Sequence, residues 1–199
     1  MNTSMSARER SDLWSAITLG AVIVGLLAFD SVRRIVQMFA APGAITVVAP
    51  VDAQPITADI GVGAPATVHE ATLVVEGVNA ISILSFVVSI VVTAGFLIAA
   101  TVLAVLISRR LMRGIVFDRK NTGMLSWMSL AILAASLVGP FFENMGLNGV
   151  FAALDDDFSG QWELFLARVP LYVTAIAIGT LVIVFQRGAA LQRETEGLV

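Results

Sequence analysis

The sequence predicts an all-α membrane protein with four transmembrane helices and a small outer β-rich segment between the first and the second. Two observations carry this prediction. The 199 residues are 57% hydrophobic and only 14% charged, whereas a soluble domain has about 25% charged residues. Four charge-free, apolar intervals of 17, 32, 22 and 18 residues are also candidates to cross a bilayer, which takes roughly 20 residues.

These intervals set the expected boundaries. The first interval has 17 residues, which exceeds the roughly 7–15-residue core of a signal peptide, so we expect it to be retained as a span. The second has 32 residues and should tilt or project beyond the membrane. We expect spans at 13–40, 79–108, 121–146 and 163–187, loops at 41–78, 109–120 and 147–162, and tails at 1–12 and 188–199.

The distribution of charge predicts the orientation. Basic residues concentrate in the two tails and in the loop 109–120, and acidic residues concentrate in the other two loops. Because positively charged loops stay in the cytoplasm, we expect a multi-pass protein of a bacterial plasma membrane with both termini cytoplasmic. Arg33 and Arg34 are exceptions at the outer end of the first span, where Asp30 shares their helix face.

The outer loop 41–78 differs in composition from the spans. Pro42, Pro50, Pro55 and Pro65 interrupt three short runs, "ITVVAPV", "ITADIGV" and "ATVHEATLVV", which are rich in Val, Ile and Thr. Such runs are typical of strands. We therefore predict a β hairpin or a three-stranded flap that packs on the helix ends, because an isolated hairpin is marginally stable in water.

The loop 109–120 carries five basic residues, for which the simplest explanation is that they fix the topology. Contact with anionic lipid headgroups is a second interpretation. The loop has a single aromatic residue, Phe117, and no interleaved stacking residues, so nucleic-acid binding is not predicted. A docking site for a partner would use the candidate interaction residues Arg109, Arg110, Arg113, Phe117 and Asn121.

A pattern of Gly114, Phe117, Asn121 and Leu125 runs through this loop into the third span. Gly114 permits a left-handed turn after a helix end, Asp118 or Asn121 can cap the next helix, and Phe117 can pack against its first turn. The pattern and the layout of the spans resemble the bacterial membrane family called domain of unknown function 2975. The resemblance implies four spans, no known reaction, and frequent genomic proximity to a small helix-turn-helix regulator.

Charges near the outer ends of the spans form a second candidate group. Its members are Asp30, Arg33, Arg34, Glu143 and Arg168. Charges in spans are functional candidates because they are costly there. With the helix ends at one depth, we expect Glu143 and Arg168 to pair across the third and fourth spans as a structural clasp. A polar vestibule for a small ligand is the alternative.

The chain has no cysteine and a single histidine, and we find no nucleophile beside a base, no carboxylate pair within a span and no phosphate loop. We therefore predict no enzyme activity, no cofactor and no metal. The expected function is that of a regulatory, sensory or accessory subunit acting by contacts with the lipid membrane, another membrane protein or a cytoplasmic regulator. The alternative is a small oligomeric channel or transporter component. Small residues at four-residue spacing, Ala16 with Gly20 and Ala100 with Ala104, suit close helix packing within the chain or in an oligomer.

Overall fold

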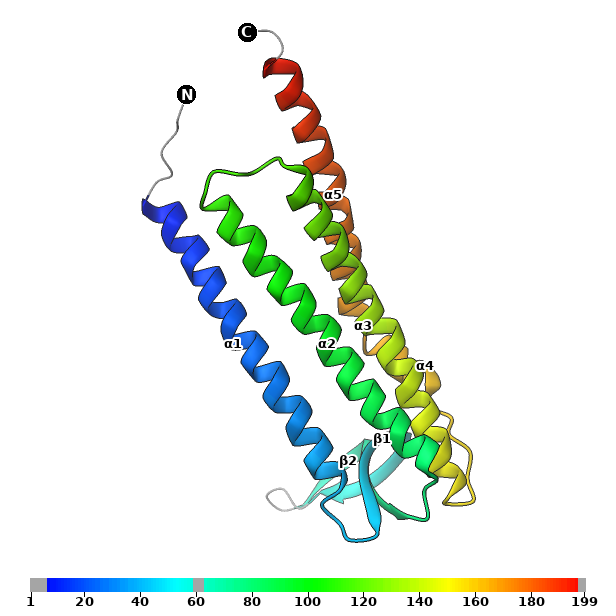
Figure 1. The fold of residues 1–199 in the computed structure, drawn as a ribbon. Helices are drawn as coiled ribbons and strands as arrows, with labels where there is room; N and C mark the ends of the chain where they lie inside the picture. Colours follow the sequence, from blue (N-terminus) through cyan, green and yellow to red (C-terminus); the bar gives the residue numbers. More distant parts are fainter. Residues whose placement is uncertain (1–6, 59–62, 197–199) are drawn as a thin grey trace. The chain divides into compact units, whose positions relative to one another are not determined.

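The computed structural model describes residues 7–58 and 63–196, which form five helices and two strands (Figure 1). The elements are α1 (Ala7–Met38), β1 (Ala44–Ala58), β2 (Ala64–Glu76), α2 (Ala80–Leu111), α3 (Arg119–Ala152), α4 (Gln161–Leu166) and α5 (Val169–Glu196). In this described part of the chain, four helical segments are long and apolar enough to cross a membrane. The predicted helical fold is thus confirmed in its four helices of membrane-span length and apolarity and in a small sheet between the first two helices.

The chain divides into two compact units. Unit 1 comprises residues 1–30, 93–136 and 170–199, and unit 2 comprises residues 31–92 and 137–169. Unit 1 contains nine of the basic and six of the acidic residues, whereas unit 2 contains three basic and nine acidic residues. Within unit 1, the start of α1, the connection from α2 to α3 and the end of α5 lie at the same end (Figure 1).

The third helix is longer than the predicted span. It ends at Ala152, inside the expected loop 147–162, because Leu147 and Val150 are fully buried and hold this turn against the core of unit 2. Asp155 ends it in a left-handed conformation with φ 56°. The amide of Asp156 donates to the Phe151 carbonyl at 3.0 Å, the six-to-one bond of a Schellman ending.

The predicted single helix at 163–187 is two helices in the structure. The short α4 ends at Leu166, and α5 begins at Val169. The break has a chemical cause, because Pro170 lacks the N–H that would continue the ladder and is tolerated only in the first turn of a helix. The amides of Ala167 and Arg168 close α4 on the carbonyls of Glu163 and Phe165, at 2.9 and 3.0 Å.

The outer segment forms an antiparallel hairpin of two long strands in the described residues, rather than three short ones. Pro50 and Pro55 lie within β1 and do not end it. Both strands of a two-stranded ribbon are edges, where proline is tolerated. The register shifts between Pro50, opposite Glu70, and Gln54, opposite Val68, so an irregularity absorbs the residues that we expected to separate two strands.

Unit 2 has a core built from both the hairpin and the helices. On β1, the alternate residues Ile45, Val47 and Ala49 are buried, as expected when one face of a sheet packs and the other is exposed. They pack with helix residues, including Phe86 of α2. The ten buried members of this core are Met38, Ile45, Val47, Ala49, Val75, Phe86, Leu147, Val150, Phe158 and Leu164.

The helices of unit 1 pack through a smaller cluster of buried residues, most of which have small side chains. Its buried cluster consists of Ala100, Ala131, Ile132 and Ala175. The Ser129 hydroxyl donates to the Ala175 carbonyl at 2.8 Å, which joins α3 to α5. In a membrane, apolar burial between helices is little more favourable than contact with lipid. Interhelical hydrogen bonds of this kind therefore contribute to helix association there.

A second bond between α3 and α5 repairs a defect made by proline. Helix α3 continues through Pro140, whose missing N–H leaves the Ser136 carbonyl without its helical donor. The Tyr172 hydroxyl of α5 donates to that carbonyl at 3.0 Å. The chain's single tyrosine therefore replaces the lost hydrogen bond, which matters because an unsatisfied carbonyl is costly in hydrocarbon.

Candidate functional site

The candidate site is the connection between α2 and α3, residues 109–120, which we call the basic corner. Helix α2 ends with Gly114 in the left-handed region at φ 75°, as the sequence predicted. The Gly114 amide donates to the Leu111 carbonyl at 2.9 Å, and the Ile115 amide donates to the Arg110 carbonyl at 3.1 Å. These are the two bonds of a Schellman motif, so the direction in which the chain leaves α2 is fixed locally.

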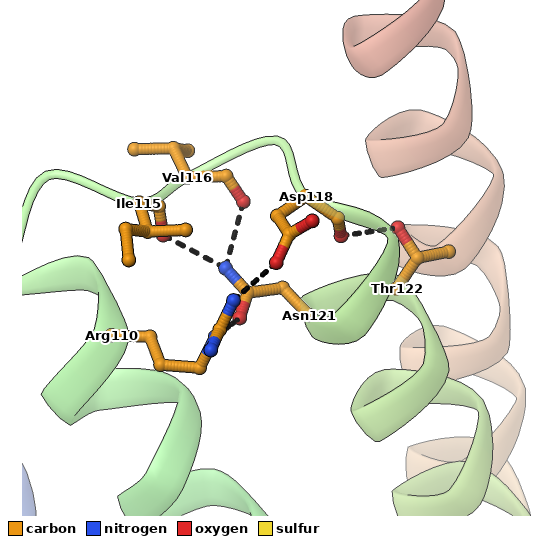
Figure 2. Close-up of polar contacts among 6 residues, drawn as sticks. All are labelled: Arg110, Ile115, Val116, Asp118, Asn121 and Thr122. Carbon is orange, nitrogen blue, oxygen red and sulfur yellow. Dashed lines mark hydrogen bonds and ion pairs between the residues drawn. The ribbon is translucent and has the colours of Figure 1, made fainter.

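Asn121 holds the remainder of the loop. Its side chain is fully buried, and its Nδ2 donates to the carbonyls of Ile115 and Val116 at 2.8 and 2.9 Å (Figure 2). Its Oδ1 accepts from Nε of Arg110 at 2.6 Å. One amide thus satisfies two loop carbonyls and binds the end of α2.

Arg110 completes this arrangement. Its guanidinium bonds to both the Asp118 carboxylate and the Asn121 amide (Figure 2). Charge-assisted pairs of this kind are stronger than neutral hydrogen bonds. Arg110, Asp118 and Asn121 together tie the end of α2 to the start of α3, and we call them the corner lock.

The corner lock differs from the capping that the sequence suggested. Asp118 does precede α3, and its main-chain carbonyl accepts the Thr122 amide at 3.1 Å. Its carboxylate is bound by Arg110, however, and Asn121 points back to the loop carbonyls. The spacing 110–118–121 could have indicated this network, because a helix C-terminus and the next N-terminus meet across a short loop.

Phe117 packs against α5, although we expected contact with the first turn of α3. Its ring lies edge-on to that of Phe185, with centroids 5.5 Å apart. A Cβ at Gly188 would lie 2.6 Å from Cε1 of Phe117, so a larger residue there would displace the ring. Gly188 lies in the predicted tail 188–199, where no local signal in the sequence indicates its contact with Phe117.

Four cations of the basic corner remain exposed. Arg109, Arg113, Arg119 and Lys120 form no ion pair with the part of the chain that the structure describes. The loop tip between them is apolar, since Ile115, Val116 and Phe117 are 37%, 39% and 42% exposed. An apolar tip flanked by cations suits a surface that meets anionic headgroups or an acidic protein.

The second candidate group consists of residues from α1, from α3 and from the link between α4 and α5. Glu143 of α3 and Arg168, which lies between α4 and α5, form the predicted ion pair at 3.4 Å. Their side chains are 26% and 31% exposed, so the pair is partly solvated. Asn144 Oδ1 and Arg168 Nε are buried and have no hydrogen-bond partner among the described residues. Asp30, Arg33 and Arg34 lie on α1, where both arginines are exposed.

Comparison with known proteins found no matching family model, curated protein or solved structure. Among the described residues, no group of three or more acidic, histidine or cysteine side chains is placed to hold a metal ion. The four long, apolar helices of the described residues suggest a helical, multi-pass membrane protein. The connection between α2 and α3 in this protein is structured and positively charged.

Proposed function

We propose that the protein is a non-enzymatic membrane protein that acts by contacts, as a regulatory, sensory or accessory subunit of a membrane assembly. The observation that carries this proposal is the combination of a corner lock with exposed cations beside it. The lock uses Arg110 and Asn121 internally, while Arg109 and Arg113 are left exposed. A preorganised surface loses less conformational entropy on binding than a mobile loop does.

The chemistry of this surface suggests an acidic partner. Four cations around an apolar tip fit an acidic, amphipathic segment of another membrane protein or of a cytoplasmic regulator. Electrostatic complementarity of this kind chiefly gives specificity and fast association. The proposed resemblance to domain of unknown function 2975 rests on the sequence pattern of Gly114, Phe117, Asn121 and Leu125. In the structure Asn121 and Leu125 are buried and Gly114 has a positive φ.

We propose that the basic corner faces the cytoplasm of a bacterium and that the hairpin lies outside. The excess of basic residues in unit 1 and of acidic residues in unit 2 supports this orientation. The chain has no cysteine, so single cysteines can report it. Thr67→Cys in the hairpin and Arg113→Cys in the corner are both at exposed positions. Labelling of whole cells by a membrane-impermeant maleimide should modify the first and spare the second, and the reverse result rejects the orientation.

The function is tested by purifying the tagged full-length protein from its native membranes in a mild detergent, with mass spectrometry of what accompanies it. We expect a stoichiometric protein partner. Changing Arg109, Arg113, Arg119 and Lys120 together to Gln should remove the partner. The matched control changes the three arginines to Lys, which keeps the charge and should retain it. The cysteine labels verify that neither variant has altered topology.

Recovery of the wild-type protein alone, as a defined oligomer, would reject the contact function and favour the channel or transporter alternative. The polar groups of the spans give that alternative little support. The hydroxyls of Thr101, Thr174 and Thr180 each donate to a carbonyl of their own helix. Bonds of this kind leave no donor for a permeating solute.

A further inference from the structure

An apolar groove of about 430 Å³ lies within unit 1, between α1 and α2, with α3 and α5 contributing to its wall. Its volume falls within the range of about 300–1,000 Å³ that is typical of small-molecule sites. Small side chains create the space, among them Ala16 on α1 and Ala100 and Ala104 on α2. The two helices meet at Gly20, where a Cβ would lie 2.5 Å from Cγ2 of Val105.

The groove is lined by apolar side chains and offers almost no hydrogen-bonding groups to an occupant. Its lining includes two hydroxyls, those of Thr101 and Ser108. Both donate to carbonyls of their own helix, Leu97 at 2.8 Å and Ala104 at 3.0 Å. A polar solute would lose its hydration there without compensation. The occupant is therefore apolar along the length of the groove.

The depth of the groove matches one leaflet of a bilayer. On α2 it runs from Leu97 to Ser108, which at 1.5 Å per residue is about 16 Å. Half of a hydrocarbon core of about 30 Å is about 15 Å. A single acyl chain of a phospholipid, which extends from the headgroup to the bilayer centre, has the length that the groove requires.

The charge at one end of the groove indicates the headgroup. Arg109 follows Ser108 directly and lies one turn beyond Val105, which also lines the groove. Arg109 is exposed and forms no ion pair with the described part of the chain. A lipid whose chain fills the groove would place its phosphate at the level of this guanidinium, where an anionic headgroup is favoured.

We propose that this groove binds one acyl chain of an anionic phospholipid, with the headgroup held by Arg109. The groove differs from the partner surface proposed above, because its walls are span residues outside the basic corner. The two proposed sites overlap at Arg109.

The test is native mass spectrometry of the full-length protein in a nonionic detergent, titrated with phosphatidylglycerol or with phosphatidylcholine of the same chains. We expect saturable binding of one phosphatidylglycerol. Ala104→Trp fills the groove and should abolish that binding. Ala99→Trp is the matched control, since Ala99 is an exposed residue of the same helix outside the groove, and it should bind like the wild type. Ala104→Leu is a milder filling, for use if the tryptophan variant does not fold.

Arg109→Gln separates the headgroup from the chain. A basic residue at a membrane surface contributes about 1 kcal/mol, so the preference for phosphatidylglycerol should fall about five-fold while phosphatidylcholine is unaffected. Equal binding of both lipids to the wild type, or equal effects of the Ala104 and Ala99 variants, would overturn the proposal. A dimer that Ala104→Trp dissociates would assign the groove to a second copy and would also overturn it. The partner purification remains a separate readout, so either proposal can fail alone.

Discussion

Replacing Asn121 with alanine tests whether the corner lock organises the basic corner. The substitution removes three hydrogen bonds, two to the carbonyls of Ile115 and Val116 and one from Arg110. A neutral hydrogen bond contributes about 0.5–1.5 kcal/mol to stability, and a bond to a charged group contributes about 1.5–3 kcal/mol. If nothing replaced them, the loss would lie between about 2.5 and 6 kcal/mol.

Solvent reduces this range. Ile115 and Val116 are more than a third exposed, so water can reach the loop and rehydrate the freed carbonyls, and Arg110 keeps its bond to Asp118. We therefore expect the lower end, a loss of about 2–3 kcal/mol in the free energy of unfolding. Amide hydrogen exchange should accelerate in residues 112–118, because the Ile115 and Val116 carbonyls lose the Asn121 donor that holds the loop.

The assay is denaturant unfolding in a mild detergent, together with hydrogen exchange read by mass spectrometry. Asn148→Ala is the matched control. Asn148 is an exposed asparagine whose side chain makes one described hydrogen bond, to the Asn144 carbonyl at 2.9 Å. This substitution should lower the free energy of unfolding by less than about 0.5 kcal/mol. Asn121→Asp keeps the acceptor for Arg110 but places a carboxylate against two carbonyl oxygens, so it should be no more stable than Asn121→Ala. A loss for Asn121→Ala equal to that of the control would refute the reasoning.

Three further substitutions probe the packing. Tyr172→Phe leaves the Ser136 carbonyl without a donor and should lower the free energy of unfolding in detergent by about 0.6–1.7 kcal/mol. In a Pro140→Ala background the helical N–H returns to this carbonyl, so the same substitution should cost less. An unchanged cost would contradict the role assigned to Pro140. Gly149→Ala should destabilise by about 1–3 kcal/mol, because the new Cβ would lie 2.5 Å from the Ser82 Cβ, while Gly95→Ala, with nothing within 4 Å, should not destabilise. Reversing either charge of the Glu143–Arg168 pair should cost about 1 kcal/mol or less, since the pair is partly exposed, and exchanging both should restore the loss; a double variant worse than either single one would argue against a clasp.

Hydropathy and charge predicted the features of the fold that depend on composition. The charge-free intervals located the four helical segments, and the breakers of residues 41–78 located the hairpin. Element ends were less predictable, because tertiary burial decided them. Leu147 and Val150 belong to the core of unit 2, and this burial extends α3 to Ala152, into the predicted acidic outer loop 147–162. Likewise, a proline ends a strand only where its missing N–H would have to bond to a neighbouring strand. Pro50 lies within β1, and the sequence does not reveal which backbone groups of a strand face a neighbour.

For the candidate site, too, features set by local backbone conformation were predictable and tertiary contacts were not. Gly114 was identifiable because a positive φ after a helix restricts the residue type. The partners of Asn121 and Phe117 were not, since they depend on which carbonyls and which helix approach the loop. Asn121 turns toward Ile115 and Val116, and Phe117 toward Gly188, which is more than seventy residues away in the sequence.

The two units differ in the residues that hold their helices together. This difference suggests a structural role for the proposed lipid in unit 1. Unit 2 has a core of ten buried apolar residues from strands, helices and the connection between α3 and α4, including Met38 of α1. The buried cluster of unit 1 has four members, three of them alanine, and none comes from α1. There α1 borders the groove, with a close approach to α2 at Gly20. An acyl chain in the groove would supply the dispersion contacts that α1 otherwise makes only in part. Its headgroup at Arg109 would then link the packing of α1 to the charge of the membrane surface beside the basic corner.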